Sequence, residues 1–175
     1  MSTYRAWYVS LAAFLLVATQ VPAEAQDEAP LRMIYAVWSD TTGAGYAMQQ
    51  MSKSARDLVE ASAILIKDKD GRIEVRQRQN KAGGSVRALQ ASQVVDTAIA
   101  RLSAGPPSTT GASGYAPDVP RRLSEKDLNK IMGMLGPGES ALILMSPKPA
   151  VSEIQRSLGV GTQSDAEIVE LEIKE

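Results

Sequence analysis

The stretch LRMIYAVWS, residues 31–39, decides which fold the rest of the chain has to build. Its side chains alternate in direction as in a β-strand, yet both alternating sets are apolar. One set is Met33, Tyr35 and Val37, and the other is Ile34, Ala36 and Trp38. Because a strand that is apolar on both sides has to be buried between two layers, we expect it at the centre of a covered sheet.

Two more runs have the same aliphatic character. Ala61–Lys67 contains AILI and Ser140–Ser146 contains LILM, so both predict buried strands. Asp68–Gly71 follows the first run and predicts a hairpin, because glycine accepts the positive φ of a tight turn. The returning strand, Arg72–Arg78, alternates more clearly.

In that returning strand, we expect Ile73 and Val75 to face the core. The charged residues Arg72, Glu74, Arg76 and Arg78 should then face water.

Helical spacing of apolar residues predicts the remaining elements. Asp40, Thr41 and Thr42 can cap a helix that ends near Glu60, and Ser124 can cap another. The predicted helices begin after Thr42, Ser85, Ser124 and Pro149, and a last strand spans Ala166–Lys174 with its glutamates outward, as at an exposed edge.

The element order is therefore β-α-β-β, a helix, a linker, then α-β-α-β. This order predicts an α+β fold in which the first six core elements match the ferredoxin-like, split β-α-β arrangement. A C-terminal helix and edge strand are added to it. Helices on one face of the sheet would leave the other face for the helix from Ser85, or for a partner subunit.

The domain organisation follows from two segments outside these elements. Residues 1–25 resemble a secretory signal, with Arg5, an apolar run and the small residues Ala23 and Ala25 before the cleavage point. We expect cleavage near Ala25 and a periplasmic or secreted protein; the alternative is an uncleaved inner-membrane anchor. Residues 31–175 form one domain, interrupted at 104–120, where 11 of 17 residues are Pro, Gly, Ser or Thr and predict a flexible linker.

Composition excludes several classes of chemistry. The 175 residues include no His and no Cys, which removes imidazole bases, thiol nucleophiles, disulfides and the usual zinc ligands. Nineteen basic against 20 acidic residues also argue against a nucleic-acid binder. We therefore assign no catalytic, cofactor or metal-binding residue, and expect no cofactor.

Several stretches resemble a bacterial family of unknown function whose members are usually described as predicted membrane proteins. The matching pieces are Ile34–Val37, the alanine-rich first helix, residues 61–75, and residues 136–144 with the short helix after them. Family members carry a Gly-rich apolar hairpin between the two halves. Here that region holds Lys81–Gly84, an amphipathic helix and the linker, so the resemblance implies neither a membrane span nor catalytic residues.

Two local patterns could bind anions. Thr41–Gly45 follows a strand and opens a helix, where backbone N–H groups gather, but a tight turn with a helix cap explains it better. Positive charge concentrates on the first hairpin, at Lys67, Lys69, Arg72, Arg76 and Arg78, and could contact an anionic partner. The simpler interpretation of this hairpin is a solvated strand whose charges prevent edge pairing.

These observations favour an exported, non-enzymatic α+β domain that acts by protein binding or self-association in the bacterial envelope, as a homodimer or with another envelope protein. One alternative is a peripheral membrane protein that uses the amphipathic helix 85–104 and the basic hairpin 67–78. A second alternative is an enzyme that needs neither His nor Cys.

Overall fold

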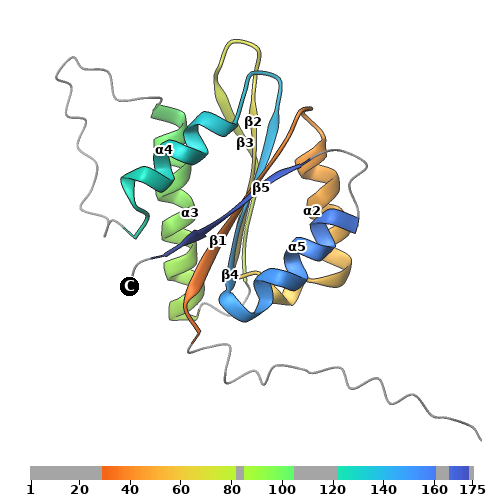
Figure 1. Cartoon of the computed structure of the whole chain (residues 1–175), viewed down its shortest axis with the longest axis vertical. Coiled ribbons are helices and arrows are strands. Elements are labelled where there is room, and N and C mark those ends of the chain that lie inside the picture. The colour runs from red at the N-terminus through yellow and green to blue at the C-terminus, as the bar shows by residue number, and fades with distance from the viewer. Residues whose placement is uncertain (1–28, 82–84, 105–121, 161–165, 174–175) are drawn as a thin grey trace, which may run out of the picture.

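The computed structural model describes residues 29–81, 85–104, 122–160 and 166–173. Within them the chain forms α+β structure, with one antiparallel sheet of five strands and four α-helices (Figure 1). The expected α+β class is thus confirmed. The predicted leader, residues 1–25, and nearly all of the predicted linker lie outside the described residues.

The elements follow the predicted order. The strands are β1 (Leu31–Trp38), β2 (Ala61–Lys67), β3 (Ile73–Asn80), β4 (Ser140–Pro147) and β5 (Glu167–Glu172). The α-helices are α2 (Gly43–Ser54), α3 (Val86–Ala104), α4 (Glu125–Met134) and α5 (Val151–Val160), and the short 3₁₀ helices are η1 (Arg56–Leu58) and η2 (Lys148–Ala150).

The strand order across the sheet is β3-β2-β4-β1-β5. β1 pairs antiparallel with β4 along its whole length, from Leu31 opposite Pro147 to Trp38 opposite Ser140. β5 pairs with the other side of β1, and β2 pairs with the other side of β4. β3 and β5 are therefore the two edges, and the edge position predicted for the last strand is confirmed.

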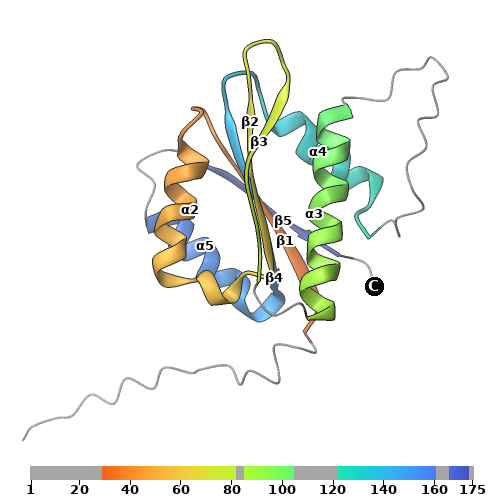
Figure 2. The same cartoon turned by 180° about the vertical axis from the view of Figure 1, so that it is seen from behind.

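Helices of the chain itself cover both faces of this sheet, as the two opposite views show (Figures 1 and 2). Met33, Tyr35 and Val37 pack in one core with residues of α3 and α4. Ile34, Ala36 and Trp38 pack in the other core with residues of α2 and α5. The burial expected on both sides is confirmed for residues 33–38, whereas Ser39 is exposed after the end of β1. The helix from Ser85 and α4 provide the second layer.

Two helices differ from the expectation. α4 lies on the same face as α3, not as α2, because its Leu128 and Ile131 join the core around Tyr35. The first helix ends at Ser54, not near Glu60, and η1 follows it. The backbone has to turn there so that Glu60 N can donate to Met145 O at 2.8 Å, which starts the pairing of β2 with β4.

A β-bulge corrects the predicted orientation of β3. Leu65 lies opposite Val75 and Ile64 lies opposite Gln77, so Arg76 is an extra residue in β3. The extra residue reverses the alternation beyond it and places Arg78 on the α3 side, against the expectation that it faces water beside Arg76. Val75 does lie on the core side, but at the sheet edge it stays 42% exposed.

The contact between Gly43 and Trp38 fixes where α2 begins. A Cβ on Gly43 would lie 2.5 Å from Trp38 Cβ and Cγ, a distance at which one of the two residues has to move. Trp38 is fully buried at the end of β1, and Gly43 is the first residue of α2. The absence of a side chain at position 43 therefore allows the helix to start directly over the indole ring.

Replacing Gly43 by alanine should lower the free energy of unfolding by about 1–3 kcal/mol, because an extra methyl group overpacks a fixed site. Gly45→Ala is the matched control in the same helix. Nothing lies within 4 Å of a Cβ built there, so alanine should be neutral or stabilise by up to about 1 kcal/mol. Urea unfolding of both variants measures the difference, and equal effects would contradict this account of Gly43.

Candidate interaction surface

The structure does not gather the five predicted basic residues into one free patch. Lys67 Nζ donates to Leu135 O at 3.0 Å, which ties the hairpin to the end of α4. Arg76 Nε lies 3.0 Å from Glu74 Oε1. Arg78 pairs with Asp96 and donates to Ser92 Oγ on α3. Three of the five cations thus already contact acceptors of this chain.

Lys69 and Arg72 lie exposed at the hairpin turn, as expected from the sequence. Asp68 Oδ1 accepts hydrogen bonds from the backbone N–H groups of Asp70 and Arg72, at 2.9 and 2.8 Å. Gly71 has a φ of +84°, which confirms the positive φ predicted for the turn. Asp68 and Asp70 accompany the two cations, so the turn carries charges of both signs.

The loop before α2 already has its own anion. Asp40 Oδ1 accepts from Thr42 N at 2.6 Å, from Thr42 Oγ1 at 2.7 Å and from Gly43 N at 2.7 Å. The next backbone N–H group, on Ala44, donates to Ser140 Oγ at 3.1 Å. These contacts satisfy the N–H groups that a phosphate would use. Asp40 of the predicted capping segment therefore binds the start of α2, whereas Thr42 at the N-cap position makes no side-chain capping bond.

These hydrogen bonds also affect the ionisation of Asp40. The bonds from the Thr42 side chain and backbone lower the pKa of the Asp40 carboxyl below its ordinary value of 3.8, because they stabilise the charged form.

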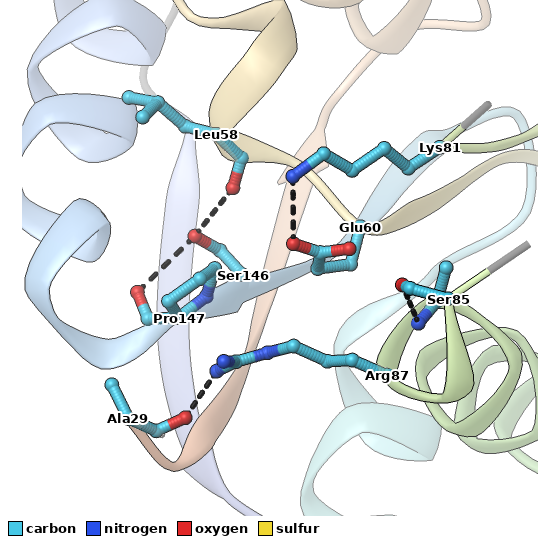
Figure 3. Close-up of polar contacts among 9 residues, drawn as sticks. Ala29, Leu58, Glu60, Lys81, Ser85, Arg87, Ser146 and Pro147 are labelled. Atoms are coloured by element: carbon cyan, nitrogen blue, oxygen red, sulfur yellow. Dashed lines mark hydrogen bonds and ion pairs between the residues drawn. The ribbon is translucent and has the colours of Figure 1, made fainter. Parts of the chain in front are cut away.

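A polar cluster that the sequence did not reveal lies at the opposite end of the sheet (Figure 3). The Glu60 carboxylate is buried and accepts from Lys81 Nζ at 3.0 Å. Ser146 Oγ donates to Leu58 O at 2.9 Å. Arg87 donates to Ala29 O, where the described chain enters β1. The cluster joins β2, β3, β4, α3 and the entry to β1, so its contacts serve the fold.

Two aromatic residues have buried polar atoms for which no hydrogen-bond partner is found, Tyr35 Oη and Trp38 Nε1. Burial and the nearby charge of Glu139 raise the pKa of the Tyr35 hydroxyl, so it stays neutral. Each ring is fully buried in one of the two cores. We therefore assign both side chains to packing.

The β3 edge, which we define as Glu74, Val75 and Arg76 on the outermost strand, is the surface that the cover of helices leaves open. Seven of the eight residues of β3 are exposed, against none of the eight in β4. Val75 is one of four large apolar residues exposed in the described chain; the others are Tyr46, Val86 and Leu89. The bulge and the charges are features that sheet edges use to limit pairing.

Within the described residues, no group of three or more acidic side chains gathers as a metal site would require. In the same part of the chain, no helix is long and apolar enough to cross a membrane.

Comparison with known proteins gives no match to a family model, to a curated protein or to a solved structure. The resemblance to the bacterial family of predicted membrane proteins therefore stays a hypothesis.

Asp40→Ala should lower the free energy of unfolding at neutral pH by about 1 kcal/mol, since the helix loses its cap. The negative charge of Asp40 contributes to the free energy of unfolding only at pH values at which the carboxylate is ionised. Because the folded pKa is lowered, this contribution is complete well above pH 3.8 and is lost as the pH falls through the folded pKa.

Asp40→Asn separates the cap from the charge, because the amide accepts hydrogen bonds but does not titrate. The stability difference between the original chain and this variant should therefore shrink towards low pH. Urea unfolding at a series of pH values measures it, with Asp70→Asn at the exposed turn as the control. A difference that is constant with pH would contradict the role given to the Asp40 charge.

Proposed function

We propose that this protein is an exported, non-enzymatic domain of the bacterial envelope that binds protein through the β3 edge. The observation that carries the proposal is that helices cover the interior strands on both faces of the sheet, whereas β3 stays exposed. α3 and α4 occupy one face and α2 and α5 the other, so the interior strands are closed to partners. β3, which carries Val75, is the more exposed of the two edge strands, and its outer backbone can still pair with another strand.

The export part of the proposal rests on the leader-like residues 1–25. Cleavage near Ala25 would leave only a few residues before Ala29, whose carbonyl is held by Arg87. The folded domain would then begin close to the new N-terminus. An uncleaved leader would instead tether the same domain to the inner membrane.

The membrane-peripheral alternative has less support. It needs the apolar face of helix 85–104, yet Ala91, Val95 and Ala98 of that helix are buried in the core. It also needs a free basic hairpin, whose Arg76 and Arg78 already pair with Glu74 and Asp96. Val86 and Leu89 are the two large apolar residues that stay exposed on this helix.

The enzyme alternative rests on no particular group of residues. Glu60 is the one buried acid in the described part of the chain, and the ammonium group of Lys81 binds it. A carboxylate that is held in this way links the ends of β2 and β3. Its position does not indicate a substrate or a reaction. We therefore place protein binding ahead of catalysis.

We further propose that the fold is an elaborated ferredoxin-like arrangement. β4 pairs antiparallel with both β1 and β2, and β1 pairs antiparallel with both β4 and β5. The units β1-α2-β2 and β4-α5-β5 are thus interleaved, and their helices α2 and α5 lie against each other. On this proposal β3, α3 and α4 form an insertion, whereas the sequence suggested that α5 and β5 were the addition.

Site-specific photo-crosslinking in the producing cell tests the proposed function. A photoreactive phenylalanine placed at Val75, or at the neighbouring exposed Gln77, should give a protein adduct of defined mass in the periplasmic fraction. The same group at Glu153, exposed on α5, is the control and should give none. Adducts from position 153 but from neither position in β3 would overturn the proposal.

A further inference from the structure

We infer that the partner of the β3 edge is a second copy of this chain, paired antiparallel about Val75. This inference rests on the proposed function, because it names the partner of the same surface. In this dimer β3 would lie next to β3 of the second copy, and the two sheets would become continuous. Such a contact is self-complementary and closes after two copies.

An apolar row that crosses the sheet ends at Val75. Val75 lies opposite Leu65, Leu65 opposite Ala141, and Ala141 opposite Val37. Leu65, Ala141 and Val37 are buried in the core beneath α3 and α4, whereas Val75 is 42% exposed. A second Val75 placed opposite the first would extend this row across the dimer and cover both side chains.

The charges beside Val75 match this pairing. Arg76 and Glu74 form an ion pair with each other at 3.0 Å, so their side chains lie on the same side of β3. Antiparallel pairing about Val75 places Glu74 of each copy opposite the bulge of the other copy, where Arg76 is the extra residue. Two such cross-strand pairs join four charges of alternating sign, and opposite charges across a strand pair are favourable.

Other registers are unfavourable. The neighbouring registers that keep each side chain on its own face change the pairing by two residues. One of them places Arg76 opposite Arg76, and the other places Glu74 opposite Glu74. In the register about Val75, a strand without a bulge would place Arg78 of one copy opposite Arg72 of the other. The bulge avoids this contact because it turns Arg78 to the α3 side, where Asp96 and Ser92 bind it. The same charges that discourage pairing with foreign strands thus permit one register with a second copy.

The other edge of the sheet lacks this self-complementarity. β5 has the sequence EIVELE, with three glutamates and no basic residue, so its self-pairing would bring acids together. Arg32 of β1 already lies 2.7 Å from Glu172 and 3.6 Å from Glu170. Pairing of β3 with β5 of another copy would be head-to-tail and could continue into open chains.

Sedimentation velocity across a range of protein concentrations tests the dimer. The original chain should pass from monomer to dimer between low and high micromolar concentration, and the dimer should weaken as salt is added. Glu74→Arg and Arg76→Glu, each alone, should weaken self-association about tenfold or more, because each places two pairs of like charges across the seam.

Mixing these two variants supplies the decisive comparison. A chain with Arg at both positions and a chain with Glu at both complement each other, so the mixture should form a heterodimer that neither variant forms as a homodimer. Both variants lose the internal pair between positions 74 and 76, so recovery in the mixture cannot come from that pair. The matched controls are Glu153→Arg and Arg156→Glu on the exposed side of α5, which should leave the dimer unchanged.

Three results would overturn the inference. They are a strict monomer at high micromolar concentration, a mixture of the two β3 variants that fails to associate, and α5 control variants that weaken self-association as much as the β3 variants do. Open assemblies that disappear when Glu170 or Glu172 is reversed would favour the head-to-tail contact and also reject the dimer. A strict monomer whose β3 still crosslinks to a different protein in the cell would reject self-pairing and leave the proposed function standing.

Discussion

The pairing of β1 with β4 is the interaction on which the rest of this structure depends. Both strands are buried on both faces, and they lie in the interior of the sheet. Their register sets Trp38 opposite Ser140, and from this end Trp38 packs against Gly43 while Ser140 binds the first turn of α2. At the other end Met145 and Ser146 hold the chain as it enters β2. One strand pair therefore positions both the start of α2 and the entry to β2.

The same pairing explains why we propose an interaction at the sheet edge. Strands that are apolar on both sides need two layers of helices, and this chain supplies both. The face that could have required a partner subunit is thereby covered. The unpaired backbone of the outermost strand remains, and β3 combines it with an exposed valine between charges of opposite sign.

The sequence predicted the elements well because their signals are local. The apolarity of residues 31–39, the Asp68–Gly71 turn and the cap at Ser124, whose Oγ accepts from Asp127 N, each depend on a few neighbouring residues. Three features depend on tertiary contacts and were missed or misplaced: the face on which α4 packs, the bulge at Arg76, and the pairing of the buried Glu60 with the exposed Lys81. No periodicity indicates an extra residue in a strand, so the position of Arg78 could not be derived from alternation alone.

Hydrogen exchange measured at low and at high protein concentration tests the central claim most directly. β1 and β4 should exchange slowest and at the same rate in both samples, because both strands are interior and covered. The outward N–H groups of residues 73–80, which do not pair with β2, should exchange quickly in the dilute sample and gain protection only in the concentrated one, when they bind a second copy. Protection that appears on β5 or on a helix surface, with β3 unchanged, would contradict the account.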